Sequence, residues 1–508
     1  MTKSSEVPKA LDYYKQSLKI AQDLKDYLRA GNALMNIGRT YILVERYKDA
    51  STALAESIDI YEKHLRGGLM DDINKISIFD TYSGSYNLLQ LAFAAQNQFG
   101  QALEVAEQSR ASAFVELMAS KQSKKLIKPL TITTPKLVDI QRIAQQQNAT
   151  LVEYSLISDI IFIWVISPSG EIAFRQVNLS QIDVPLSELV RNSRNGIGAR
   201  GRIPRASAQV VLQPRQEKDL QTLHQLLIEP ISSLLPKDQN QPIIFIPQGE
   251  LFLVPFPALK DARGQYLIDR HTILTSPSIQ VLEQTQQRRK ILQQQWANKT
   301  VSPALVVGNP AMPKIKLGDQ TEILKSLPGA ATEGKEIATI LTSTMLTGHQ
   351  ATKSKVVEQM KDARFVHLAT HGLLDDFRGF GIPGAIALAP DQPGQENSGL
   401  LTADEISTLS LNAELAVLSA CDTGRGTITG DGVVGLSRSL IVAGVPSVVV
   451  SLWKVSDEST AMLMTEFYQN LQRKSTKAQA LRKAILKTKK TYADPYYWAA
   501  FTLIGEAE

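Results

Sequence analysis

Cysteine is nearly absent from the sequence: the 508-residue chain has one, Cys421. A single thiol cannot form a disulfide within the chain, which favours a reducing compartment. A structural zinc site usually takes four cysteine and histidine ligands, and six scattered histidines beside one cysteine do not supply a recognisable set. A glycine-rich phosphate-binding fingerprint is also missing. We therefore expect no metal and no cofactor.

The chain also lacks a strong excess of charge and a long apolar run. Its 55 basic residues nearly balance its 50 acidic ones, so a nucleic-acid partner is not implied. No segment approaches the ~18–20 uninterrupted apolar residues of a membrane helix. Residues 1–9 are polar and carry no apolar signal-peptide core. These absences predict a cytoplasmic protein without a membrane partner.

The first part of the chain repeats itself. Three residue sets share the same helical spacing and begin with a small residue: Ala10-Tyr14-Ser17, Ala50-Leu54-Ser57 and Ala102-Ala106-Ser109. A matching apolar helix precedes the second and third sets, and the first unit shows only its second helix. This paired pattern resembles tetratricopeptide repeats, although its steps of 40 and 52 residues exceed the usual length of about 34. Stacked repeats commonly bind a protein or peptide, so we expect a regulator here; a purely structural bundle is the alternative.

The rest of the chain alternates strand and helix patterns. Strands that are apolar on both faces, separated by helices, indicate a mostly parallel sheet covered by helices, that is, an α/β domain behind an all-α solenoid. One long helix is predicted over 459–489 and a last strand over 498–504. The predicted organisation is helical repeats in 1–122, a linker with a helix in 123–148, and two α/β parts in 149–300 and 301–508.

Two predicted strand ends carry reactive side chains. One strand is predicted over 365–369 and leads to His371 and Gly372. The other is predicted over 416–419 and leads to Cys421. Because the carboxyl ends of parallel strands meet at one edge of a sheet, we expect the imidazole and the thiol to lie close together. Histidine can then take the thiol proton and generate the reactive thiolate. The order and the separation of 50 positions match the spacing known for caspases.

The surroundings of this pair suggest further roles. The backbone N–H groups of Gly372 and Cys421 are candidate donors to a developing oxyanion. No side chain is identifiable as a third member of a triad, so backbone carbonyls are expected to orient His371. His367 is interpreted as a core or supporting residue. The other histidines are given structural interpretations: His64, His224, His271 and His349.

Several motifs together resemble the CHAT domain. The matching segments are 367–372, 418–424, 430–432, 435–436, 443–444, 451–453 and 496–501, with 245–249 and 254–256 further upstream. The resemblance spans about 145–508. It implies a caspase-like, separase-related fold, commonly found behind tetratricopeptide repeats. It also implies hydrolysis of a peptide bond in a protein substrate through a thioester, and makes 149–300 a pseudo-peptidase half. Asp422 departs from the pattern, because many family members have Glu after the nucleophile.

The sequence gives less information on the substrate pocket. By similarity to the separase pattern, Asp457 is a candidate to receive a basic P1 side chain, but it equally suits the cap of a helix beginning near Ser459. Asp422 is a second candidate, or it bonds the local backbone of its turn. Trp453 is interpreted as a pocket wall, with a core position as the alternative.

Three functions remain open on the sequence. The leading one is a regulated cysteine endopeptidase that uses Cys421 and His371. The second is a non-catalytic signalling scaffold of tetratricopeptide repeats and a CHAT domain, which the presence of both reactive residues disfavours. The third is a cysteine acyltransferase or another amidohydrolase, which would need a small-molecule pocket.

Overall fold

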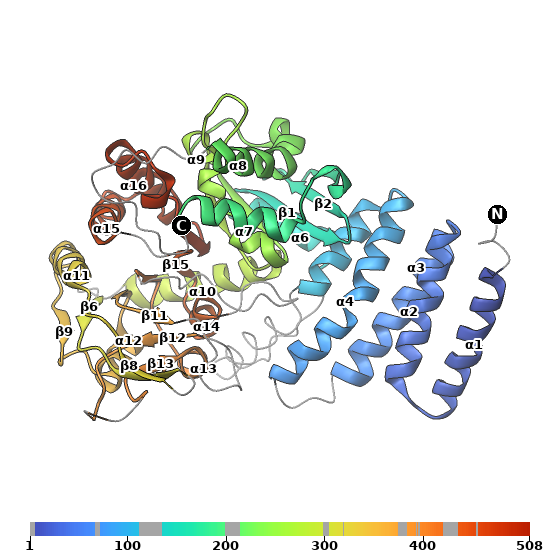
Figure 1. Ribbon diagram of the computed structural model, residues 1–508, viewed down its shortest axis with the longest axis horizontal. Helices are drawn as coiled ribbons and strands as arrows, with labels where there is room; N and C mark the ends of the chain where they lie inside the picture. Colours follow the sequence, from blue (N-terminus) through green and yellow to red (C-terminus); the bar gives the residue numbers. More distant parts are fainter. Residues whose placement is uncertain are drawn as a thin grey trace.

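In the computed structural model of the chain, a helical region is followed by an α/β region built on one large sheet (Figure 1). The structure describes residues 6–66, 72–110, 135–198, 214–297, 304–317, 320–373, 384–392, 394, 397–419, 435–453 and 456–508. Cys421 and Asp422 lie outside these ranges. The predicted fold class, helical repeats followed by a mostly parallel α/β sheet, is confirmed.

The helical region consists of antiparallel neighbours that approach closely at small residues. Its helices are α1 (Val7–Asp23), α2 (Tyr27–Leu43), α3 (Tyr47–Ile60), which continues into a π-helical turn, and α4 (Asp72–Ala95); residues 99–110 are also helical. A Cβ on Gly38 would lie 2.4 Å from Cγ of Leu54, so this crossing requires glycine. Ser57 Oγ, on the same face of α3, donates a hydrogen bond to the carbonyl of Gly31 at 2.9 Å.

Eleven strands of the described chain form the main sheet, in the order β3-β2-β1-β4-β5-β16-β15-β14-β10-β6-β9. Their bounds are β1 Thr150–Ile157, β2 Ile160–Ile166, β3 Ile172–Asn178, β4 Pro242–Ile246, β5 Thr272–Thr275, β6 Ala304–Pro310, β9 Met345–Gly348, β10 Phe365–Ala369, β14 Leu415–Leu418, β15 Ser447–Ser451 and β16 Phe501–Gly505. Two short sheets stand apart from it: β7 (Lys314–Leu317) with β8 (Gln320–Ile323), and β11 (Gly372–Leu373) with β12 (Ala385–Ala387) and β13 (Leu400–Thr402).

The sheet contains two parallel sets of strands that run in opposite directions. Strand β16 is parallel to β5 but antiparallel to β15, so the direction changes between β16 and β15. Along the register, Phe245 pairs with Thr275, Thr275 with Ile504, and Ile504 with Val448. The carboxyl end of β4 is therefore level with the amino end of β15. The carboxyl ends of β10 and β14 lie at the opposite edge of the sheet.

Helices cover both faces of the sheet. Their bounds are α6 Leu137–Gln147, α7 Leu186–Gly196, α8 Pro214–Leu227, α9 Leu267–Arg270, α10 Ile279–Ala297, α11 Pro328–Ile340, α12 Lys353–Asp362, α13 Ala403–Thr408, α14 Leu436–Val442, α15 Asp457–Gln472 and α16 Lys477–Thr491. Val417 packs in the same core as α11 and α15, whereas its neighbours Ala416 and Leu418 pack with α12 and α14. This alternation is the two-residue period of a strand buried on both faces.

The prediction of one helix over 459–489 is wrong. The structure has two helices, α15 and α16, separated by a turn in which Lys474 adopts a positive φ of 62°. A positive φ ends an α-helix, and the side chain of Thr476 then caps the next helix by accepting from the N–H of Gln479. The two helices pack side by side as a consequence.

The last described repeat residues share their core with the α/β domain. Ala102, Leu103 and Ala106 are fully buried in one cluster with residues of β1 and β2. The indole Nε1–H of Trp164 on β2 donates to the carbonyl of Phe99 at 2.9 Å. The repeats and the sheet therefore form one continuous hydrophobic unit at this junction.

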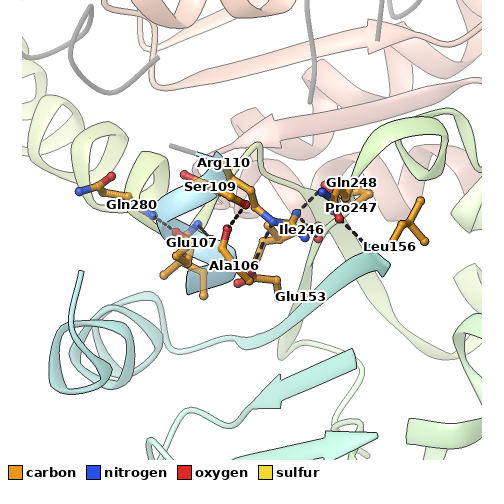
Figure 2. A network of polar contacts seen from close by, with 12 residues as sticks. Ala106, Glu107, Ser109, Arg110, Glu153, Leu156, Ile246, Pro247, Gln248 and Gln280 are labelled. Atoms are coloured by element: carbon orange, nitrogen blue, oxygen red, sulfur yellow. Dashed lines mark hydrogen bonds and ion pairs between the residues drawn. The ribbon is translucent and has the colours of Figure 1, made fainter. Parts of the chain in front are cut away.

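A buried polar network reinforces this junction (Figure 2). The Arg110 guanidinium donates to the carbonyls of Ile246 and Pro247, at 3.1 and 2.8 Å, and its Nε lies 3.2 Å from the Glu153 carboxylate of β1. The Glu107 carboxylate accepts from the first N–H groups of α10, where the helix dipole favours a negative charge. Burial and the adjacent Glu107 carboxylate raise the pKa of Glu153 well above its ordinary value.

This raised pKa predicts how stability depends on pH. The folded protein binds the Glu153 proton more tightly than the unfolded chain, so the free energy of unfolding falls as pH rises above about 4.5 toward the folded pKa. For one proton the slope is at most about 1.4 kcal/mol per pH unit. Glu153→Gln removes this dependence, so urea unfolding at pH 5, 7 and 9 should show the variant gaining stability relative to the native chain as pH rises. Glu171→Gln, at an exposed turn residue, is the control; parallel curves for Glu153→Gln and the native chain would contradict the account.

Candidate active site

The candidate site is built on two neighbouring strands in aligned register. Strands β10 and β14 are parallel, and Leu368 pairs with Leu418. His371 and Cys421 each follow these paired residues by three positions. Cys421 lies outside the described residues, but the strand that precedes it does not. The alignment brings the ends of the two strands that precede these positions in the chain to the same sheet edge.

A backbone carbonyl orients His371. The ring Nε2 lies 2.8 Å from the carbonyl oxygen of Lys325, in the segment that leads into α11. A carbonyl oxygen only accepts hydrogen bonds, so Nε2 carries the proton, and Nδ1 carries the lone pair in the neutral ring. The expected orientation by a backbone carbonyl is therefore present, and Nδ1 is the nitrogen able to act as a base.

Gly372 directs its amide away from its neighbouring strand. The N–H of Ala387 donates to the carbonyl of His371 at 2.9 Å, and Gly372 faces Ile386 at the next position. Hydrogen-bonded and non-hydrogen-bonded pairs alternate in antiparallel ladders, so the Gly372 N–H points to the side of β11 opposite β12. Strand β11 is the edge of its sheet. Thr370 anchors this turn, because its hydroxyl donates to the carbonyl of Ala387 at 2.6 Å.

His367 lies in the core instead of at the strand end. Its side chain is fully buried, with Nδ1 3.2 Å from the hydroxyl of Tyr468 on α15 and Nε2 3.1 Å from the carboxylate of Glu333 on α11. The latter pair is close but poorly aligned for a hydrogen bond. Burial, and then the Glu333 charge, raise the pKa of Tyr468 well above its ordinary value, so its hydroxyl stays protonated. This trio fixes α11 and α15 on the strand that delivers His371.

Asp457 and Trp453 occupy different environments after β15. Helix α15 begins at Asp457, with Ser456 as its N-cap, so Asp457 is in the first turn and is not the cap. The Asp457 side chain packs on α11, since a Cβ on Gly329 would lie 2.1 Å from its Cβ. The Trp453 ring is fully buried and its Nε1–H donates to the carbonyl of Tyr496 at 3.2 Å. We therefore assign Trp453 to the core.

An acidic groove runs between α11 and α15. Its volume is about 620 Å³ and its walls carry four carboxylates and one lysine: Glu336, Asp457, Glu458, Glu466 and Lys487. One end of the groove lies at Gly329, four residues after Lys325. One end of the groove is therefore close in sequence to Lys325, whose carbonyl orients His371.

Within the described ranges, no cluster of three or more histidine, cysteine, aspartate or glutamate residues has metal-binding geometry. The same ranges hold no helix whose length and apolar character suit a membrane crossing.

Comparison with known families assigns the two parts of the chain. The family model of the CHAT domain matches residues 217–506, more than half of the chain, and a tetratricopeptide-repeat model matches residues 3–63. The chain belongs to the CHAT-domain family. Within the CHAT domain, the match includes β10, β14 and β15, and hence both strand ends that carry the candidate dyad.

The curated relatives are much longer proteins. The chain is 23% identical to mouse and 24% identical to human tetratricopeptide repeat protein 28, over 559 aligned positions and 85% of its own length. It spans 22% of the length of these relatives. Crystal structures of the Saccharomyces cerevisiae separase–securin complex align with 90% of the chain at 11% and 12% identity, with TM-scores of 0.48 and 0.47, and cover 37% of the matched chain.

The sequence did not indicate three features of this CHAT domain. The Lys325 carbonyl is a main-chain group and leaves no side-chain pattern. Tyr468 and Glu333 come from separate helices, and only the buried position of His367 within an apolar strand hinted that polar partners were needed.

The core position of His367 can be tested by deleting one hydroxyl. Tyr468→Phe removes the partner of a buried ring nitrogen and should lower the free energy of unfolding by about 1–2 kcal/mol. The rate at which iodoacetamide alkylates Cys421 should stay unchanged. Tyr13→Phe, at a residue 69% exposed on α1, is the control and should change neither quantity. A large loss of Cys421 reactivity in Tyr468→Phe would show that His367 belongs to the reactive site.

Proposed function

We propose that this chain is a regulated cysteine endopeptidase in which Cys421 is the nucleophile and His371 is the general base. The observation that carries the proposal is the register of β10 and β14. It pairs Leu368 with Leu418, and each of these residues precedes a reactive residue by three positions. The orientation of His371 by Lys325 adds support, because it leaves Nδ1 as the basic nitrogen. Membership of the CHAT-domain family is consistent with this chemistry.

The proposed reaction proceeds by acyl transfer. His371 Nδ1 takes the thiol proton, and the Cys421 thiolate attacks the carbonyl carbon of the scissile peptide bond. The N–H groups of Gly372 and Cys421 hold the oxygen as it becomes negatively charged. The imidazolium then gives its proton to the leaving amine, which leaves a thioester on Cys421. Water, deprotonated by the same imidazole, hydrolyses the thioester and restores the thiol.

The acidic groove supports a substrate with a basic P1 residue. Asp457 packs against Gly329, which follows Lys325 by four residues and lies at one end of the groove. Further carboxylates line the groove along its length. An arginine side chain forms strong charge-assisted hydrogen bonds with a carboxylate, which gives both affinity and selectivity. Asp422 remains a second candidate for the same role.

The helical repeats are proposed to bind a protein or peptide regulator. Most of the strongly exposed large apolar side chains in the described residues belong to α1, α2 and the turns beside them: Tyr13, Ile20, Leu24, Tyr27, Leu28, Leu43 and Val44. Exposed apolar side chains that gather on neighbouring helices are candidates for a protein-binding surface. A reducing compartment such as the cytoplasm suits an enzyme whose single cysteine is its nucleophile.

Residues 149–300 are proposed to be a non-catalytic, pseudo-peptidase half. This part contains no cysteine. Its strands β1, β4 and β5 direct their carboxyl ends to the edge opposite that of β10 and β14. Its role is accordingly to extend the sheet and to join the repeats to residues 301–508.

Covalent labelling tests the dyad. Peptidyl acyl-oxymethyl-ketones with Arg, Lys, Leu or Asp at P1 should label the native chain, and Cys421→Ala should abolish labelling. His371→Ala should slow labelling by about 100-fold or more, because general-base catalysis commonly contributes 10²–10⁴. His349→Ala, at an exposed histidine after β9, is the matched control and should label normally. No labelling of the native chain, with or without cell lysate as a source of regulator, would favour the scaffold function.

The same probes test the P1 preference. Asp457→Asn keeps the size of the side chain but removes its charge, so labelling by the Arg probe should fall by about tenfold while labelling by the Leu probe changes little. Asp362→Asn, on α12 across the sheet, is the control. Equal effects of Asp457→Asn on the Arg and Leu probes would exclude Asp457 from the P1 pocket.

A further inference from the structure

Asn309 lies beside the segment that supplies the Lys325 carbonyl. It is near the end of β6, the strand next to β10, and its backbone adopts a positive φ of 48°. Asparagine is one of the few residues with a side chain that enter this region readily. The preceding Gly308 is closely packed, since a Cβ there would lie 2.7 Å from the carbonyl oxygen of Ala330 on α11. The backbone at this position is therefore held firmly against α11.

The Asn309 carboxamide binds the two residues that follow Lys325. Its Oδ1 accepts a hydrogen bond from the N–H of Leu327 at 2.8 Å. Its amide also bonds the hydroxyl of Ser326, with Nδ2 at 3.1 Å and Oδ1 at 3.2 Å from Oγ. Peptide groups are planar, so these contacts limit how the chain from Lys325 to Leu327 can rotate. The carbonyl one residue earlier is the one that accepts from His371.

We propose that Asn309 is a positioning residue for the candidate dyad, and that it acts on His371 through the main chain of residues 325–327. The proposal rests on the proposed function for its catalytic consequence. In this arrangement the carboxamide replaces the orienting side chain of a triad: it fixes a carbonyl, and the carbonyl fixes the ring and its tautomer. Because a carbonyl oxygen is neutral, it orients the imidazolium without supplying a full countercharge.

Two substitutions separate the effect of the Asn309 side chain from the effect of its backbone conformation. Asn309→Gly removes the carboxamide but tolerates the positive φ, so it does not strain the turn. Asn309→Asp keeps an oxygen that accepts from Leu327 and from the Ser326 hydroxyl, and it also tolerates this φ. The matched control is Asn148→Gly, because Asn148 has a similar φ of 46° at the end of α6, far along the chain from β6 and β10.

The readout is the pH dependence of alkylation of the sole thiol. Iodoacetamide reacts with the Cys421 thiolate, and an ordinary thiol with a pKa near 8.5 reacts little at pH 6. A paired imidazole keeps a reactive thiolate at pH 6 in the native full-length chain. His371→Ala should lose this reactivity. Asn309→Gly should lower the rate at pH 6 by about tenfold or more, since small displacements of catalytic groups have effects of this size. Asn309→Asp should stay within about threefold of the native rate, and Asn148→Gly should be unchanged.

The outcomes of this experiment are distinct. If His371→Ala leaves the pH profile unchanged, the proposed dyad is wrong, and the proposed function fails with it. If His371→Ala changes the profile but Asn309→Gly does not, the dyad stands and the role of Asn309 is overturned, even when urea unfolding shows Asn309→Gly to be less stable. Nitrogen NMR of the ring, recorded at a pH at which the ring is neutral, supplies a second readout: the native chain and Asn309→Asp should show the Nε2–H tautomer of His371, and Asn309→Gly a mixture. A pure Nε2–H tautomer in Asn309→Gly would also overturn the proposal.

Discussion

The register between β10 and β14 is the constraint on which the candidate site depends. Leu368 pairs with Leu418 inside a sheet that is buried on both faces, and a slip of one residue would exchange the side chains that face α11 and α15 for those that face α12 and α14. Core packing therefore fixes the register, and the register fixes the relative level of Ala369 and Leu418, the last strand residues before His371 and Cys421 in the chain. Strand β6 lies on the other side of β10 and contains Asn309. Asn309 bonds the residues that follow Lys325, and the Lys325 carbonyl orients His371.

The reversal of strand direction between β16 and β15 puts the carboxyl ends of the two parallel sets of strands at opposite edges of the sheet. Arg110, at the end of the repeats, bonds the main chain at the carboxyl end of β4 (Figure 2). The strand directions put this end of β4 at the sheet edge opposite the carboxyl ends of β10 and β14. Helix α10 contacts both regions: Glu107 caps its amino end, and Arg288 in its middle donates to the carbonyls of Gly444 and Leu411 near α14. The described junction between the repeats and the sheet therefore lies at the sheet edge opposite the carboxyl ends of β10 and β14.

The sequence predicted most clearly the parts that local pattern determines. The apolar run 365–369 predicted β10 with its observed bounds. The break between α15 and α16 was missed because Lys474 is not a residue whose type signals a positive φ. Trp453 was expected at a pocket wall, but tertiary packing buries it completely. The roles of Lys325 and Asn309 depend on contacts between distant segments, which periodicity does not encode.

The most direct test of the central claim is hydrolysis of a proteome-derived peptide library, with mass spectrometry to identify the new termini. The account predicts that the native chain, with lysate as a source of regulator, produces termini after arginine or lysine, and that these termini disappear in Cys421→Ala assayed with the same lysate. Identical sets of termini from the native chain and from Cys421→Ala, under conditions in which iodoacetamide shows the Cys421 thiolate to be reactive at pH 6, would contradict the assignment of this CHAT domain as a peptidase.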